Sequence, residues 1–161
     1  MTDKNQAIID YLTDCPYVEN NPLFFNFGNA KDSDIQIVAQ SNDVSLNRTY
    51  VDGSVLKRFT FNLLIYKSVS YNPLVTAEGY PNENVEELKE VQNIIDWITT
   101  QNRLENFPDF GDDCTIESIE ALTNNPAMNG VNSSVMPPLA TYNISINVTY
   151  CDFENTVWNK N

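Results

Sequence analysis

The side chains in this sequence that are best suited to chemistry are carboxylates, and histidine is missing. Of the 161 residues, 22 are Asp or Glu and 9 are Lys or Arg, which gives a formal net charge of −13 at pH 7. Without histidine, the chain lacks the usual general base near neutral pH and any Ser–His or Cys–His nucleophile pair. The sequence also has no GxSxG elbow, no GxxxxGKS/T phosphate loop and no GxGxxG motif. We therefore predict that the chain is not an enzyme and has no catalytic residues.

One group of carboxylates has the composition of a cation site. Glu105, Asp109, Asp112 and Asp113 could offer oxygen ligands to a hard cation. Their spacing does not match a calcium loop, so we interpret them as a solvated turn and expect no metal and no cofactor. Paired carboxylates could also hydrolyse glycosides, but no spacing singles out a pair.

Charge and cysteine usage limit the partners and the compartment. Binding to phosphates or to an anionic membrane requires clustered Lys and Arg, which this acidic chain lacks. The N-terminus is polar and has no signal-peptide pattern. Cys15, Cys114 and Cys151 are far apart and lack metal-binding spacing, so we expect buried, reduced thiols. We expect a soluble protein made in a reducing cytoplasm, with no membrane association.

Hydrophobic periodicity predicts the elements that position these side chains. In chain order we expect a helix over 4–15, strands over 22–28, 34–40 and 56–66, a helix over 84–104, and strands over 114–122 and 141–150. Strand 56–66 has the clearest pattern, because apolar and polar residues alternate from Phe59 to Ile65.

Turn and cap signals connect these elements. We expect the strands over 22–28 and 34–40 to pair across the polar turn 29–33. Asn84 and Glu87 have the spacing of a capping box at the start of the second helix. The imperfect alternation of 114–122 indicates a bulge.

The order α-β-β-β-α-β-β predicts an α+β fold. We expect a mainly antiparallel sheet with the two helices packed on one face. Residues 1–151 are predicted to form a single domain and 152–161 a C-terminal tail. The stretch 41–53 is polar and turn-rich, and 123–138 has no periodicity, so both are expected to be loops.

The loop 123–138 and the tail contain apolar residues in irregular segments, which often become ordered against a partner. The candidate protein-interface residues are Pro126, Met128, Val135, Met136, Pro137 and Trp158. The alternative is an ordinary mobile loop and a frayed chain end.

Three stretches resemble a family. They are Tyr50-Val51-Asp52-Gly53-Ser54 with Lys57-Arg58-Phe59-Thr60-Phe61, the block from Ile95-Asp96-Trp97-Ile98 through Gln101-Asn102 to Asn106-Phe107-Pro108-Asp109-Phe110-Gly111, and Ser118-Ile119-Glu120-Ala121-Leu122 with Pro126. Together they resemble the tail terminators, often labelled minor capsid proteins, of long-tailed (siphovirus-type) phages. The likeness covers about residues 5–151 and rests on turn and packing residues.

The resemblance implies an α+β subunit of a ring, usually a homohexamer, in the tail-neck region of the virion. Such a ring caps the tail tube, stops its polymerisation and joins it to the head connector or neck protein, and DNA only passes through its lumen. The family has no catalytic residues to transfer.

Two alternatives remain open at this stage. A neck or head-completion protein would be a structural component one layer nearer the capsid. A small host metal-binding protein or hydrolase belongs to a different class, which a screen for turnover with and without divalent ions would test.

Overall fold

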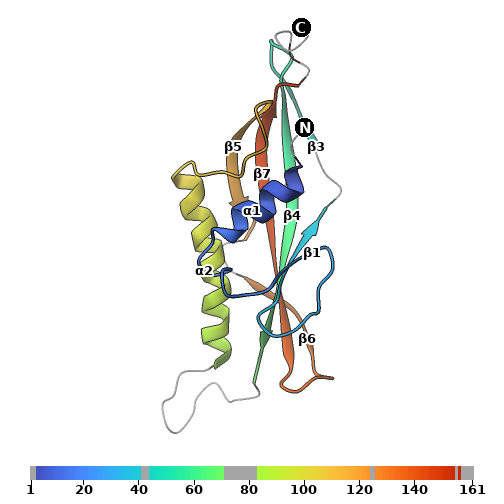
Figure 1. Ribbon diagram of the computed structural model, residues 1–161, viewed down its shortest axis with the longest axis vertical. Coiled ribbons are helices and arrows are strands. Elements are labelled where there is room, and N and C mark those ends of the chain that lie inside the picture. Colours follow the sequence, from blue (N-terminus) through green and yellow to red (C-terminus); the bar gives the residue numbers. More distant parts are fainter. Residues whose placement is uncertain (1–2, 41–43, 71–82, 124–125, 155, 157–161) are drawn as a thin grey trace.

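A computed structural model describes residues 3–40, 44–70, 83–123, 126–154 and 156. The described residues form two helices and seven strands (Figure 1). In chain order these are α1 (Lys4–Thr13), β1 (Leu23–Phe25), β2 (Ile35–Ala39), β3 (Val44–Thr49), β4 (Val55–Ser68), α2 (Glu83–Arg103), β5 (Cys114–Ala121), β6 (Ala127–Asn132) and β7 (Leu139–Asp152).

Two long antiparallel strands, β4 and β7, form the centre of the sheet. They pair along their whole length, from Val55 opposite Asp152 to Ser68 opposite Leu139. The sheet order is β1-β2-β4-β7-β5, with β3 on β4 and β6 on β7. Figure 1 shows β4 and β7 running the length of the molecule, so each central strand carries two short strands in succession.

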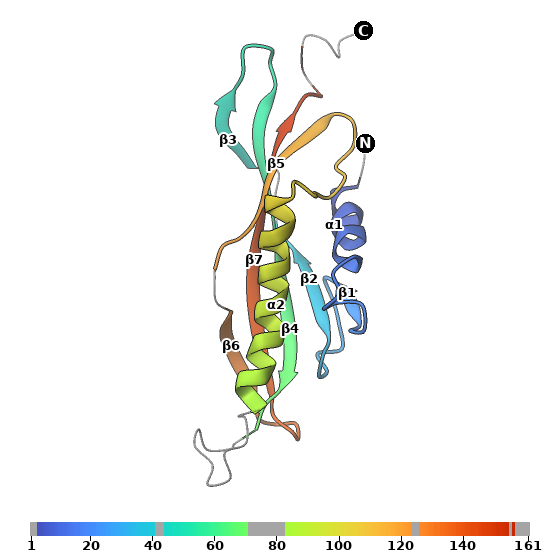
Figure 2. The same ribbon diagram turned by 90° about the vertical axis from the view of Figure 1, so that its left-hand side faces the viewer.

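Both helices pack on one face of this sheet, and the core lies between them and the sheet (Figure 2). The core cluster combines alternate residues of β4 and β7 with one stripe from each helix. The Tyr11 and Trp97 rings, 5.2 Å apart between centroids, connect α1 to α2. The predicted α+β fold, with a mostly antiparallel sheet, is confirmed.

On the opposite face of the sheet, polar side chains of β4 and β7 bond to one another. The Thr60 hydroxyl donates to Asn147 Oδ1 (2.7 Å), and the Ser145 hydroxyl donates to Asn62 Oδ1 (2.8 Å). These bonds cross between β4 and β7, because directly opposite residues share a face of the sheet.

Two strands in the structure are absent from the predicted element order. Residues 44–49 and 127–132, expected to be loops, form β3 and β6. Five of the six β3 residues are exposed, so burial imposed no apolar period on them. Their hydrogen-bond partners come from the long neighbours β4 and β7, which extend past the helices.

The predicted pairing of the first two strands is confirmed, but the predicted turn between them was wrong. Leu23 pairs with Ile35 in a parallel arrangement, so residues 26–34 form a returning loop and not a tight hairpin. Positive φ angles at Ala30 (52°) and Ser33 (67°) allow this path.

At α2, the expected capping role of Asn84 was not found. Asn84 lies inside the helix, and its side-chain amide bonds the Ser70 backbone N–H and C=O, both at 2.8 Å. The predicted bulge in β5 is confirmed by a register shift between Ile116 and Ser118.

Candidate interaction surfaces

The candidate interface residues of the sequence meet largely at one hairpin. Met128 lies in β6, and Val135, Met136 and Pro137 lie in the turn that leads to β7; all four are exposed. Val131, which sequence reasoning missed, joins them from β6. We define the β6–β7 patch as Met128, Val131, Val135 and Met136, with exposed fractions of 55%, 44%, 43% and 83%.

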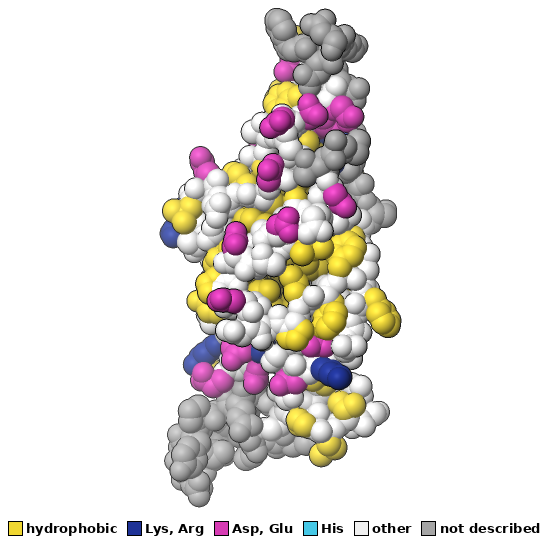
Figure 3. Space-filling view, in the orientation of Figure 1, with side chains coloured by type: hydrophobic (Ala, Val, Ile, Leu, Met, Phe, Trp, Pro, Cys, Tyr) yellow, Lys and Arg dark blue, Asp and Glu magenta, His cyan; other side chains and the backbone are white. Residues whose placement is uncertain are grey.

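The β6–β7 patch lies at one end of the molecule, where Figure 3 shows hydrophobic side chains on the surface. Exposed apolar residues that cluster, rather than occur singly, mark interaction surfaces. Pro126, which precedes β6, is half-buried and contributes less to the patch. Trp158 lies outside the described residues.

The opposite end of the molecule is formed by the β3–β4 hairpin. Its turn is closed by the Gly53 N–H donating to the Tyr50 carbonyl (3.0 Å) and the Tyr50 N–H donating to the Ser54 carbonyl (2.8 Å). Gly53 has a φ of 90°, which favours glycine. The Ser54 hydroxyl and N–H donate to Asp52 Oδ1, and these bonds hold the pKa of Asp52 below its usual value. The turn leaves Val51 fully exposed.

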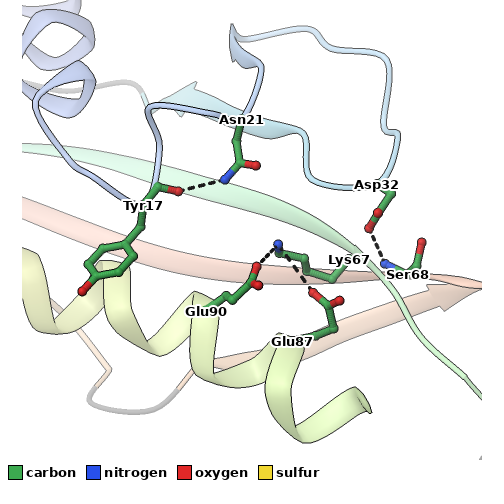
Figure 4. Close-up of polar contacts among 7 residues, drawn as sticks. All are labelled: Tyr17, Asn21, Asp32, Lys67, Ser68, Glu87 and Glu90. Carbon is green, nitrogen blue, oxygen red and sulfur yellow. Dashed lines mark hydrogen bonds and ion pairs between the residues drawn. The ribbon is translucent and has the colours of Figure 1, made fainter.

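A buried lysine is the side chain in the described residues that most resembles a catalytic group. Lys67, at the end of β4, forms ion pairs with Glu90 and, at 3.5 Å from Nζ to Oε2, with Glu87 (Figure 4). Its side chain is 6% exposed. Burial by itself lowers the pKa of Lys67, but the hydrogen bond and charge of Glu90, aided by Glu87, outweigh burial and raise it.

The raised pKa decides the role of Lys67. A lysine acts as a nucleophile or general base when its pKa is lowered towards neutrality. Lys67 instead stays protonated and connects the sheet to α2. Nearby, the Ser68 N–H donates to Asp32 Oδ1 (2.7 Å) and the Asn21 amide donates to the Tyr17 carbonyl (2.8 Å), which anchors the loops beside this cluster (Figure 4).

The pKa values of other potential nucleophiles are also raised, which favours their protonated, unreactive forms. Burial raises the pKa of the Cys15 and Cys114 thiols, which disfavours the reactive thiolate. Burial, with a smaller effect of Cys15, also raises the pKa of Tyr11, whose hydroxyl donates to the Asn106 carbonyl (3.1 Å). These groups have structural roles in the geometry described.

Within the described part of the chain, no group of three or more Cys, Asp or Glu residues is arranged to hold a metal ion. The Asp109 carboxylate, one of the predicted turn residues, accepts a hydrogen bond from the Gly111 N–H (2.9 Å). Neither helix in the described residues combines the length and apolar character needed to cross a membrane.

No protein-family model matches this chain, and no curated protein matches it significantly.

Proposed function

We propose that this chain is a structural subunit of a long-tailed phage, a tail terminator whose ring caps the tail tube and joins the tail to the head. The observation that carries the proposal is the β6–β7 patch. Met136 is 83% exposed in the turn between β6 and β7, and Met128, Val131 and Val135 of the same hairpin are exposed as well. Met is favoured at protein interfaces, and covering such a patch by a partner is energetically favourable.

The long sheet supports an assembly role because it carries exposed apolar residues at both of its ends. The β6–β7 patch lies at one end, and the exposed Tyr50 and Val51 lie at the other. A subunit with two separate contact regions can touch two different neighbours, as a terminator must touch the tube and the connector. The resemblance of residues 50–61, 95–111 and 118–126 to the tail-terminator family favours the same reading.

The charge of the chain also suits a ring through which DNA passes. A net charge of −13 repels phosphate, so DNA would move through the lumen without binding to it.

A tube-capping assay tests the proposal. Purified chain added to polymerising tube protein should shorten the tubes and be found at their ends by cross-linking. The double variant Val135→Asp/Met136→Asp should lose capping while its melting temperature stays within about 2 °C of the native value, because both side chains are exposed. Cross-linking to the portal ring instead of the tube would favour a neck protein. Tubes of unchanged length with the native chain would reject the terminator role.

A further inference from the structure

A groove runs between α1 and the segment that follows α2. Its volume is about 410 Å³. The lining residues that decide its chemistry are Tyr11 and Phe107 on the floor and Asp3, Asp10, Asp14 and Asp109 around it. Within the described residues, the lining includes no Lys or Arg. Figure 3 shows acidic side chains distributed among hydrophobic ones over this face. An occupant should therefore combine positive charge with apolar surface.

Two acids of the groove, Asp10 and Asp14, weaken the helix that carries them, whereas Asp3 caps its N-terminus by accepting from the Asn5 and Gln6 N–H groups. Asp10 lies in the last turn of α1 and Asp14 caps its C-terminus, where the last turn holds no basic residue. Negative charge is unfavourable at the carbonyl end of a helix, and like charges four residues apart repel. The Asp10 carboxylate accepts a hydrogen bond from Gln6 Nε2 (2.8 Å). Because Asp10 and Asp14 lower the stability of α1, a contact between these charges and another molecule readily explains their presence.

The β3–β4 hairpin has the complementary chemistry. Residues 44–58 hold three of the 9 Lys and Arg residues and only one of the 22 acids, a net charge of +2, which leaves −15 for the rest of the chain. Lys57 pairs with Asp152. Arg48 and Arg58 are exposed and have no carboxylate partner within the described residues. The Arg48 guanidinium lies 6.0 Å from the centre of the Tyr50 ring, so charge and apolar surface occur together.

The hairpin is also poorly covered within its own chain. Five of the six residues of β3 are exposed, and among the strands of the described residues β3 pairs only with β4. The β4 strand of the hairpin also pairs with β7, from Val55 opposite Asp152 to Arg58 opposite Thr149, so the uncovered part of the hairpin is β3 and the turn. Figure 2 shows the β3–β4 hairpin extending past both helices and lying on the side opposite α1. The hairpin therefore points away from the α1 groove of the same chain.

We propose that the β3–β4 hairpin of one copy docks in the α1 groove of the next copy. Arg48 faces the aspartates of the groove, and Tyr50 and Val51 contact its apolar floor. Hairpin and groove are different surfaces, so the contact is head-to-tail and generates a ring when the rotation closes. This inference rests on the proposed ring function and specifies the contact between its subunits.

Charge reversal tests the contact by sedimentation velocity at low salt over a wide range of protein concentration. Arg48→Glu and the double variant Asp10→Lys/Asp14→Lys should each associate at least tenfold more weakly than the native chain. In an equimolar mixture, the acidic hairpin of Arg48→Glu can dock in the lysine-bearing groove of Asp10→Lys/Asp14→Lys. The native hairpin of Asp10→Lys/Asp14→Lys can dock in the native groove of Arg48→Glu. The mixture should therefore recover association to within about threefold of the native value.

Two further variants keep the test decisive. Lys31→Glu makes the same change in charge at an exposed site outside both surfaces and should associate like the native chain. Val51→Asp changes only the fully exposed turn and should also weaken association, with an unchanged melting temperature. In addition, Asp10→Lys/Asp14→Lys should not lower the melting temperature, because it replaces negative charge with positive charge at the carbonyl end of α1.

The inference is overturned by any of three results. These are unchanged association of both charge-reversal variants, a mixture no better than its components, or a loss with Lys31→Glu as large as with Arg48→Glu. A native chain that stays monomeric at every concentration overturns it as well. The proposed function is judged separately by tube capping, so a chain that caps tubes without this contact would keep the function and lose only the inference.

Discussion

Replacing Glu90 with Gln removes the negative charge that pairs with Lys67, the buried lysine that connects the sheet to α2. Lys67 is 6% exposed, whereas the Glu90 side chain is 60% exposed. The variant keeps the shape of the side chain and an oxygen that can accept a hydrogen bond. It therefore tests the charge of the pair and not its packing.

The structure sets the size of the effect. Hydrogen bonds to charged groups contribute about 1.5–3 kcal/mol and neutral ones about 0.5–1.5 kcal/mol. Complete loss of a buried partner costs about 3–5 kcal/mol, but Glu87 remains near Lys67 and Glu90 is partly hydrated. We expect Glu90→Gln to lower the free energy of unfolding by about 1–2 kcal/mol. For a chain of this size the melting temperature should fall by about 2–8 °C.

Two matched variants on the same helix complete the experiment. Glu86 pairs with Lys89 at 2.8 Å, but both side chains are more than half exposed. Glu86→Gln should therefore cost less than about 0.5 kcal/mol. Burial raises the pKa of Glu87 despite the opposing effect of Lys67, so its ionised form is less favourable in the folded than in the unfolded chain. Glu87→Gln should leave stability unchanged or increase it.

Urea unfolding of the three variants at pH 7 measures this order. The cost of Glu90→Gln should fall less at high salt than that of Glu86→Gln, because Lys67 is buried and both members of the Glu86–Lys89 pair are exposed. Equal costs for Glu90→Gln and Glu86→Gln would refute the reasoning. A Glu87→Gln variant as unstable as Glu90→Gln would refute it too.

Three other predictions concern the core, pH and reactivity. Ile144→Ala, at a fully buried site opposite Leu63, should cost about 2–5 kcal/mol in urea unfolding, and a smaller loss contradicts the described packing. Burial opposes the charge of Asp152, but bonds from Lys57 and the Glu154 N–H outweigh burial and lower its pKa below 3.8. Its contribution is therefore present above that pH and lost as pH falls through the lowered value. Asp152→Asn should cost about 1–2 kcal/mol at pH 7 and progressively less in acid, and a pH-independent difference contradicts this. Cys15, fully buried with a raised pKa, should react with iodoacetamide at least tenfold more slowly at pH 8 than in urea, as mass spectrometry can measure.

The elements with a buried face were the ones that the sequence predicted well. The alternation from Phe59 to Ile65 and along β7 reflects one face packed against the helices, and the structure extends both strands by a few residues. The stripe on the second helix reflects burial of Val91, Ile95 and Ile98. In each case burial imposes a periodicity that can be read locally.

Elements held by hydrogen bonds alone were not predictable in this way. β3 and β6 are largely exposed, so their sequences carry little alternation, and their pairing depends on the extra length of β4 and β7. The parallel pairing of β1 with β2 was missed because a polar, turn-forming segment suits either a hairpin or a returning loop. Such choices are made by tertiary contacts.

The candidate surface shows the same division. Met128, Val135 and Met136, predicted as interface candidates because they are apolar residues in a segment without periodicity, are exposed in the structure, and their interface role stays a prediction. Val131 was missed because its position follows from the register of β6 on β7. The ion pairs of Lys67 were also missed, since they depend on how α2 packs against the end of β4.

The most direct test of the central claim is electron microscopy of phage particles made without this chain. We expect tails of uncontrolled length, or tails that are not attached to heads, with normal particles restored when the native chain is supplied. Tails of normal length joined to heads in its absence would contradict a tail-terminator role.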